Sequence, residues 1–192
     1  MEYDVVIVGG GPSGLAASIK FAQLNKKNNT NYSICLLEKG SEIGAHILSG
    51  NVFQPNALDE LIPNWKELNA PLNVPVKKDK IMYLLKNIGV PVPSFLMPTM
   101  NNHGNYVISL GNLCRWLSEQ AESLGVEVFP GFPASKLLIE NDEVVGVQTG
   151  DMGISESGDL KPGHEAGIEI RAKYTILGEG CRGHLGKQII EK

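Results

Sequence analysis

Cysteine is scarce in this sequence of 192 residues, which contains only Cys35, Cys114 and Cys181. Their odd number and wide spacing argue against a disulfide-stapled scaffold, and the absence of a C-x-x-C pair removes the usual zinc and redox-dithiol motifs. We therefore expect a chain of a reducing compartment that has no metal ligands of its own. Cys35 is expected to be a small buried apolar residue.

Long apolar runs and an excess of positive charge are also missing. No apolar run approaches the ~20 residues that a membrane-spanning helix needs. The formal net charge is −4, and no run of lysine or arginine is long enough to cover a face, which argues against nucleic acid as a partner. A structural strand is expected to begin at Tyr3, so we expect no signal or transit peptide.

What is present at the start of the chain is a glycine turn between a strand and a helix. The β-branched run Tyr3–Val8 leads into Gly9–Gly14, which has the spacing G-x-G-x-x-G, and an apolar helical pattern follows. Gly9 permits a tight turn, Gly11 lets the backbone approach a pyrophosphate, and Gly14 allows close packing of the helix on the strand. The free N–H groups at the start of the helix point at the phosphates. This order predicts a dinucleotide-binding turn.

A second strand is expected at Tyr32–Leu37, where nearly continuous apolar character is typical of a buried parallel strand. It ends on Glu38, 24 residues after Gly14. An acidic side chain close to this position binds the ribose hydroxyls of a dinucleotide. The alternative is a solvated carboxylate at a strand end, but the position directly after the second strand favours ribose binding.

The rest of the sequence predicts an α/β domain with a β-hairpin and a Pro-rich insertion at residues 41–105. Few regular periods occur in the insertion beyond a short helix at Pro55–Leu61, and proline excludes a long helix or a central strand at Ile88–Met100. The other expected elements are a strand at Tyr106–Leu110, an amphipathic helix ending at Gly125, a strand at Val126–Phe129, a hairpin of Ala134–Glu140 and Val144–Gln148, a Gly-rich polar loop at Gly150–Gly167, strands at Ile168–Ala172 and Tyr174–Leu177, and the start of a helix at Ile189–Lys192.

The last expected strand leads into Gly178-Glu179-Gly180. This element resembles the second nucleotide motif of FAD-dependent oxidoreductases of the glutathione-reductase and hydroxylase type, in which an acidic residue and a glycine make a turn beside the cofactor. Glu179 stands where Asp is commoner. Two matched motifs imply FAD rather than NAD, and the implied fold class is an FAD/NAD(P)-binding Rossmann-like α/β domain.

Strings between and within these motifs give a more specific match. Five of them together resemble the family of electron-transfer flavoprotein–ubiquinone oxidoreductases: Ile43–Gly50 (IGAHILSG), Pro63–Lys66 (PNWK), Ala70–Asn73 (APLN), Met100–Tyr106 (MNNHGNY) and Glu179–Leu185 (EGCRGHL). The resemblance extends over nearly the whole chain. It implies an enzyme, a flavin-dependent oxidoreductase that passes electrons from reduced electron-transfer flavoprotein to ubiquinone in the respiratory chain.

The resemblance also implies that parts of the enzyme lie elsewhere. In the family the FAD domain is discontinuous, and the quinone-binding part and a four-cysteine iron–sulfur cluster (4Fe-4S) lie further along the sequence. We therefore expect residues 1–192 to be the N-terminal portion of the FAD domain, without its C-terminal part, inactive alone and binding FAD poorly. The expected location is peripheral, on the cytoplasmic face of the bacterial inner membrane or on the mitochondrial inner membrane of a eukaryote.

The expected FAD-binding residues come from the two motifs and from the loop that follows Glu38. They are Gly9, Gly11, Pro12, Ser13, Gly14, Glu38, Lys39, Gly44, Ala45, Glu179, Gly180 and Arg182. His46 is a candidate flavin-proximal residue, with a structural histidine in a turn as the alternative. Arg182 is suited to a pyrophosphate, with a surface residue at the start of a helix as the alternative. No catalytic side chain is expected, because the flavin supplies the redox chemistry.

Two apolar segments, Ile43–Ile62 and Ile81–Met100, raise the question of a membrane or quinone-facing surface. An apolar segment broken by proline cannot hide all of its side chains in regular packing, and exposed apolar patches mark partner or membrane surfaces. The alternative is a loop folded over the domain core. Two other functions stay open for the chain: an FAD reductase or monooxygenase of the geranylgeranyl-reductase type, and a non-catalytic nucleotide-fold interaction module.

Overall fold

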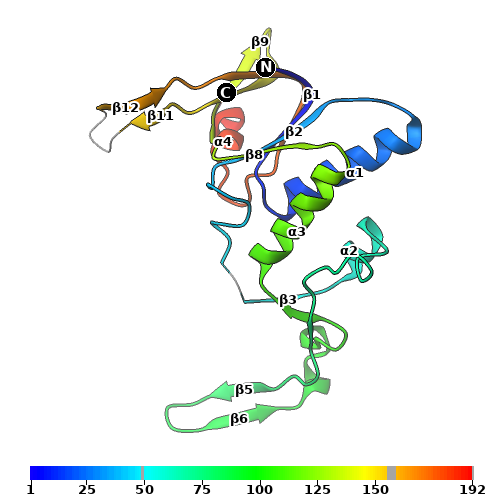
Figure 1. Cartoon of the computed structure of the whole chain (residues 1–192). Coiled ribbons are helices and arrows are strands. Elements are labelled where there is room, and N and C mark those ends of the chain that lie inside the picture. Colours follow the sequence, from blue (N-terminus) through cyan, green and yellow to red (C-terminus); the bar gives the residue numbers. More distant parts are fainter. Residues whose placement is uncertain (49, 155–158, 192) are drawn as a thin grey trace. The chain divides into compact units, whose positions relative to one another are not determined.

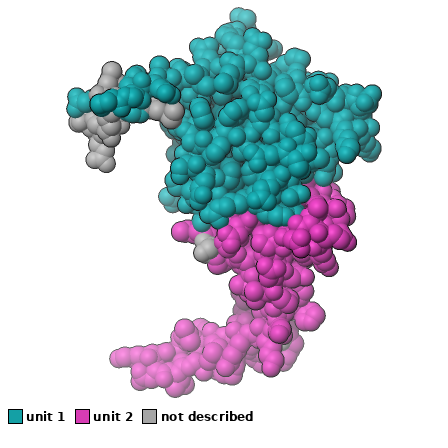
Figure 2. Space-filling view, in the orientation of Figure 1, with its two compact units in different colours: residues 1–47, 114–192 teal, residues 48–113 magenta. Residues whose placement is uncertain are grey.

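The computed structural model describes residues 1–48, 50–154 and 159–191. It divides into two compact units, which Figure 2 draws in different colours: unit 1 comprises Met1–Ile47 and Cys114–Lys192, and unit 2 comprises Leu48–Leu113. Ser49, in one of the family strings, and residues 155–158, in the expected Gly-rich loop, lie outside the described residues. The insertion expected at residues 41–105 overlaps unit 2, and its assignment as a domain stays a prediction.

Unit 1 is built on a six-stranded sheet with the order β8-β2-β1-β13-β10-β9. Figure 1 labels β1, β2, β8 and β9 of this sheet. The strands are β1 Glu2–Val8, β2 Ile34–Glu38, β8 Glu127–Pro130, β9 Ala134–Glu140, β10 Glu143–Thr149 and β13 Glu169–Leu177. β8, β2, β1 and β13 run parallel, whereas β10 pairs antiparallel with both β13 and β9. The predicted parallel pairing of the first two strands is confirmed.

Helix α1, Pro12–Asn28, connects β1 to β2 as a parallel pair requires. Leu15, Ile19 and Ala22 are buried along one stripe of the helix, as the 3.6-residue period predicts. The helix ends at Asn28, and Asn29 closes it in the left-handed conformation (φ 53°). Asparagine tolerates this conformation better than most residues do.

Helix α3, Leu110–Ser123, begins in unit 2 and continues in unit 1. Its buried side chains include Leu113, Leu117 and Ala121, so the predicted amphipathic stripe is confirmed. Gly125 has a φ of +91° just after the helix, where a left-handed residue ends the last turn. β8 then returns the chain to the edge of the sheet beside β2.

The core of unit 1 includes a cluster that joins four strands to the last helix, α4, His184–Ile190. Its buried members are Val6, Val8, Cys35, Leu37, Val147, Ile170, Ala172 and Leu185. Gln188 of α4 accepts a hydrogen bond from the Leu137 N–H and donates one to the Ser135 carbonyl, which holds α4 to β9. The helix expected to start at Ile189 therefore begins five residues earlier, because Leu185 and Gln188 dock it on the sheet.

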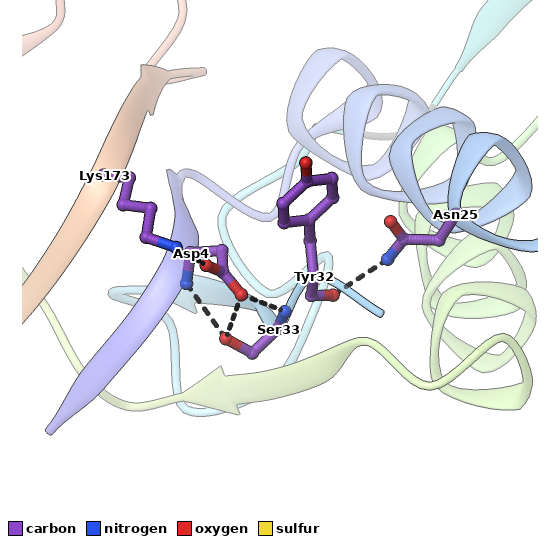
Figure 3. Close-up of polar contacts among 5 residues, drawn as sticks. All are labelled: Asp4, Asn25, Tyr32, Ser33 and Lys173. Atoms are coloured by element: carbon purple, nitrogen blue, oxygen red, sulfur yellow. Dashed lines mark hydrogen bonds and ion pairs between the residues drawn. The ribbon is translucent and has the colours of Figure 1, made fainter. Parts of the chain in front are cut away.

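Hydrogen bonds and an ion pair of Asp4 connect the start of β1 to its neighbouring strands (Figure 3). The Asp4 carboxylate accepts hydrogen bonds from the Ser33 N–H at 2.8 Å and the Ser33 hydroxyl at 3.1 Å, and it pairs with Lys173 Nζ at 2.6 Å. The neighbouring Tyr32 carbonyl accepts a hydrogen bond from Asn25 Nδ2 of α1 at 2.8 Å. Ser33 precedes β2 and Lys173 lies in β13, so one carboxylate joins both strands that flank β1.

Unit 2 contains a small sheet of order β3-β7-β4, a helix and a separate hairpin. Its elements are β3 Asn51–Phe53, α2 Asn56–Leu61, β4 Val74–Pro75, β5 Ile81–Leu84, β6 Gly89–Val92, the 3₁₀ turns Ser94–Leu96 and Pro98–Met100, and β7 Tyr106–Ile108. Trp65 is buried, packs edge-on against Tyr106, and donates its indole N–H to Asp59 Oδ1 at 2.7 Å. This anchor holds the segment after α2 against β7.

Besides the start of α4, three sequence expectations need correction. Within the expected loop Gly150–Gly167, β11 Met152–Ile154 pairs with β12 Leu160–Glu165, because a glycine-rich sequence still forms a ladder when it folds back on itself. The two strands expected around residue 173 are one strand, β13, in which Arg171 and Lys173 are exposed while Ile170 and Ala172 are buried. β5 and β6 form a hairpin inside the expected Pro-rich loop region, and Pro91 is tolerated there because a two-stranded hairpin has open edges.

Candidate functional site

The turn after β1 has the backbone geometry that its glycines permit. Gly9 has a φ of +108°, and a Cβ atom there would lie 2.4 Å from the Gly178 carbonyl oxygen. A Cβ atom on Gly14 would lie 2.0 Å from the Gly9 carbonyl oxygen. The ends of β1 and β13 and the start of α1 are therefore packed backbone to backbone, which only glycine allows.

Gly11 differs from these two glycines, because a Cβ atom there would meet no atom within 4 Å. It is the N-cap of α1, no side chain caps the helix, and the first turn contains no acidic residue. Pro12 and Ser13 are exposed beside it. The start of α1 therefore presents its positive end to open space, and this arrangement fits a pyrophosphate held on backbone N–H groups.

The Glu38 carboxylate lies against the glycine turn. Its Oε2 accepts the Gly10 N–H at 2.7 Å and its Oε1 accepts the Gly40 N–H at 2.7 Å. The side chain is 14% exposed. A carboxylate oxygen has two lone pairs, so each oxygen can accept a further hydrogen bond from a ribose hydroxyl. Glu38 therefore both shapes the turn and keeps acceptor capacity beside it.

The loop after Glu38 carries the other residues predicted for this side of the site. Gly44 has a φ of +85° in a tight turn, in which Ala45 N–H bonds the Glu42 carbonyl. His46 Nδ1 lies 3.8 Å from Glu38 Oε1, and its side chain is 59% exposed. Lys39 is exposed at the end of β2. The structure thus brings His46 and Glu38 together, and the roles of these loop residues toward a cofactor stay predictions.

The second motif meets the first at Gly178, whose N–H donates to the Val8 carbonyl at 2.7 Å. The Glu179 carboxylate accepts the backbone N–H groups of His184, Leu185 and Gly186 at 3.0 to 3.1 Å. These contacts cap the start of α4. The Glu179 side chain therefore has a structural role that the sequence did not indicate. Gly180 adopts a φ of +78°, and Arg182 is exposed.

Several contributors to the turn were missed from the sequence. Gly10 is buried and donates to Glu38, and a Cβ atom on it would lie 2.6 Å from Ile43 Cδ1. Gly40 supplies the second N–H to the same carboxylate. The run of three glycines at 9–11 was the only local indication that position 10 needs glycine. The need itself arises from the side chain of Ile43, which is distant in sequence.

The site holds no evident nucleophile or metal cluster. Burial raises the pKa of the Cys114 thiol to about 11, with Glu38 adding to the rise. Burial likewise raises the pKa of Cys35 to about 12, with Glu127 adding to it. Within residues 1–48, 50–154 and 159–191, no group of three or more histidine, cysteine or acidic residues is placed to hold a metal ion. The arrangement is suited to binding a nucleotide.

A family model and solved structures agree with this fold. A model described as an NAD(P)-binding Rossmann-like domain matches residues 7–66. A geranylgeranyl bacteriochlorophyll reductase-like protein from Thermoplasma acidophilum has a TM-score of 0.69 at 23% identity, over 97% of this chain and 41% of that one. The myxobacterial FAD-dependent halogenase CndH has a TM-score of 0.65 at 16% identity, over 97% and 39%. The predicted fold class is confirmed, and these two structures show the fold alone.

Curated relatives are much closer in sequence. The electron transfer flavoprotein-ubiquinone oxidoreductase of Pseudomonas aeruginosa is 57% identical over the whole of this chain and 36% of its own length. The mitochondrial protein of that name from Homo sapiens is 48% identical over the whole chain and 31% of its own length. The chain thus spans about a third of the length of these relatives. The resemblance predicted from the motifs is confirmed, and the chain is homologous over its whole length to part of the electron transfer flavoprotein-ubiquinone oxidoreductases.

Proposed function

We propose that this chain supplies the FAD-binding, Rossmann-like part of an oxidoreductase that passes electrons from reduced electron-transfer flavoprotein to ubiquinone. The observation that carries the proposal is the 57% identity over all of the chain to a relative of that name. The uncapped start of α1 beside Gly11 supports the nucleotide-binding part of the proposal, because its N–H groups face open space. The flavin, when bound, supplies the one- and two-electron chemistry.

In this proposal the chain's residues bind and orient the dinucleotide. The N–H groups at the start of α1, next to Gly11 and Ser13, hold the pyrophosphate. Glu38 accepts hydrogen bonds from the ribose hydroxyls through its remaining lone pairs. The remaining residues assigned to the cofactor lie in the loop after Glu38 and in the second motif: Lys39, Gly44, Ala45, His46, Glu179, Gly180 and Arg182.

We favour FAD over NAD as the cofactor because two nucleotide motifs lie together at one end of the sheet. The Gly178 N–H bonds the last residue of β1, so the second motif lies beside the glycine turn. The alternative of a geranylgeranyl-reductase type enzyme has the support of a similar fold at 23% identity. The 48–57% identity to proteins named electron transfer flavoprotein-ubiquinone oxidoreductase favours the quinone oxidoreductase.

We place the 4Fe-4S cluster of this electron path outside these 192 residues. Two of the three cysteines, Cys35 and Cys114, are buried in the fold of unit 1 and lie in separate elements. Cys181 is exposed and has no cysteine near it in sequence. A cluster needs four thiolates, which this chain does not possess.

We propose peripheral membrane contact through Ile81–Met100, on the bacterial cytoplasmic membrane or the mitochondrial inner membrane. Tyr83, Leu84, Ile88 and Phe95 of this segment are 62–78% exposed. The second predicted segment, Ile43–Ile62, is a weaker candidate, because Ile43, Leu58 and Ile62 are buried in it. No helix among the described residues is long and apolar enough to cross a bilayer.

Both the cofactor and the reaction can be tested by spectroscopy on the protein purified from its native cells. We expect a yellow protein from which denaturation releases FAD, and which reduces a short-chain ubiquinone when supplied with reduced electron-transfer flavoprotein. Release of NAD, or a colourless protein with no quinone reduction, contradicts the proposal. A separate titration of the 192-residue chain with FAD measures its own share of the site, for which we expect binding weaker than micromolar.

A further inference from the structure

Unit 2 contains a basic hollow at the base of the β5–β6 hairpin. Its volume is about 260 Å³, and it is lined on one side by residues 76–81 and on the other by Pro91, Val92, Met100, Asn101 and His103. Lys77, Lys78 and Lys80 all contribute to the lining and are exposed. Three lysines therefore line the hollow where the two strands of the hairpin begin and end.

Three lysines and one aspartate leave the lining of the hollow with a net charge of +2. Asp79, the one acidic residue of the lining, accepts the Asn102 backbone N–H at 2.8 Å and the Asn102 side-chain amide at 3.2 Å. None of the ion pairs among the described residues involves Lys77, Lys78 or Lys80. The carboxylate is thus used to hold the turn at Asn102.

The surrounding segment is basic in a chain that is acidic. Residues 74–108 contain four lysines and one aspartate, a net charge of +3, whereas the whole chain has −4. The remaining residues therefore carry −7. Such an asymmetry directs an anionic surface to this segment and repels it from the rest of the chain.

The basic hollow adjoins the hairpin of β5 and β6, whose strands lie side by side in Figure 1. Its exposed side chains are apolar apart from Lys86 and Asn87 at the turn. Beyond the hollow, Tyr83, Leu84 and Ile88 are 65%, 77% and 62% exposed. Each strand has four residues, so the hairpin is about 13 Å long at ~3.3 Å per residue. That length is less than half of the ~30 Å hydrocarbon core of a bilayer.

We propose that this hollow binds the phosphate of an anionic phospholipid headgroup in the bilayer that the hairpin enters. The proposal rests on the membrane contact proposed above and names its lipid class. A hairpin lying obliquely in the bilayer surface would bury its apolar side chains, while Lys86 at its turn and Lys77, Lys78 and Lys80 at its base stay at the level of the headgroups, where phosphates lie. A free phosphate would use the ammonium groups but leave the apolar strands without a role, so a lipid satisfies both features.

Vesicle binding by the 192-residue chain tests the proposal. Co-sedimentation is measured with vesicles of phosphatidylcholine alone and of phosphatidylcholine mixed with phosphatidylglycerol. At about 1 kcal/mol for each lysine near an anionic surface, the triple variant K77Q/K78Q/K80Q should bind the mixed vesicles up to about a hundredfold more weakly at low salt. The loss should shrink at about 1 M salt, where the Debye length is about 3 Å.

A charge-matched control separates this site from net charge. Lys20, Lys26 and Lys27 are exposed on α1 in unit 1. The variant K20Q/K26Q/K27Q removes the same charge and should keep the binding to mixed vesicles within a fewfold of the original chain. An equal loss in both triple variants, with unchanged circular dichroism, would overturn the proposal. An unchanged preference for mixed vesicles in K77Q/K78Q/K80Q would overturn it as well.

Two further arms distinguish the lipid from its alternatives. L84S/F95S should weaken binding to both vesicle types, because it removes apolar contact and leaves the lysines. If it does so while the lysine variant has no effect, the membrane contact stands and the headgroup site is refuted. If inorganic phosphate binds the original chain as tightly as the mixed vesicles do, and in a lysine-dependent way, the hollow is a site for free phosphate and the lipid is refuted.

Discussion

The Glu38 carboxylate accepts a hydrogen bond from the Gly10 backbone N–H, with Oε2 2.7 Å from the nitrogen. The contact joins the end of β2 to the turn that leaves β1, and the Gly40 N–H completes it on the other oxygen. A residue placed to bind ribose therefore also sets the shape of the turn that binds the pyrophosphate. The two halves of a dinucleotide site depend on one side chain.

Replacement of Glu38 should accordingly weaken nucleotide binding more than the loss of one ribose contact would. In E38Q the amide nitrogen cannot accept a hydrogen bond, so one of the two backbone N–H groups loses its partner. A hydrogen bond to a charged group contributes about 1.5–3 kcal/mol, so we expect FAD affinity, measured by flavin fluorescence, to fall about tenfold or more. E42Q is the matched control, because Glu42 is 63% exposed and its side chain pairs with Arg115, away from the glycine turn. Equal affinities of E38Q and the original protein would contradict this role.

Gly11 and Gly14 should respond oppositely to the same change. G11A places its methyl group in open space at a φ of −82°, so the thermal unfolding midpoint should stay within a few degrees of the original. The methyl group occupies the space assigned to the pyrophosphate, so FAD affinity should fall at least tenfold. G14A puts a Cβ atom 2.0 Å from the Gly9 carbonyl oxygen and should lower the unfolding midpoint.

Calorimetry and an FAD titration on both variants check the pair. A stable G14A would mean that α1 moves away from β1 easily. Unimpaired FAD binding by G11A would mean that the pyrophosphate lies elsewhere.

Much of unit 1 follows from local patterns in the sequence. The apolar runs at Tyr3–Val8 and Tyr32–Leu37 had the length and composition of buried parallel strands, and the glycine spacing fixed the start of α1. The hairpin of β9 and β10 was recognisable because Asn141 and Asp142 both tolerate a positive φ, here 49° and 66°. These elements depend on residues that are neighbours in sequence.

The features that were missed depend on residues that are distant in sequence. The Glu179 carboxylate caps α4, which requires knowing where that helix begins. The β5–β6 hairpin escaped prediction because Ile81–Leu84 has no polar alternation, and its strands are mostly exposed instead of half-buried. Position 10 requires glycine because the Ile43 side chain lies beside it. None of these requirements leaves a periodic mark in the sequence.

The three cysteines should differ in reactivity toward a thiolate-selective reagent. With a pKa of about 12, roughly one Cys35 thiol in 10⁴ is ionised at pH 8, and the pKa of about 11 for Cys114 has a similar effect. Both are fully buried, whereas Cys181 is exposed. Iodoacetamide at pH 8 should therefore alkylate Cys181 alone in the folded chain and all three in denaturant, as mass spectrometry would show. C181S should stay unlabelled when folded, and labelling of Cys35 before unfolding would contradict the packing described here.

The ion pair and hydrogen bonds of Asp4 should make the free energy of unfolding depend on pH in the acidic range. The hydrogen bond from Lys173, followed by that from the Ser33 N–H, lowers the pKa of Asp4 below its ordinary 3.8. The unfolded chain therefore binds the proton more readily than the folded one. The stabilisation is complete above the unfolded pKa and disappears as pH falls through the folded value.

Thermal unfolding of D4N and the original chain across pH tests this dependence. The midpoint of D4N should be lower at pH 7. The difference should begin to shrink near pH 3.8, where the unfolded chain takes up the proton, and should close as pH falls through the lower pKa of Asp4 in the folded chain. Because the Asp4 carboxylate forms its ion pair with an exposed lysine, Lys173, added salt should reduce the difference at pH 7. E60Q, at an exposed carboxylate in α2, should show no such convergence. A difference between D4N and the original chain that is the same at pH 3 and pH 7 would show that the hydrogen bonds to Ser33 act without the charge.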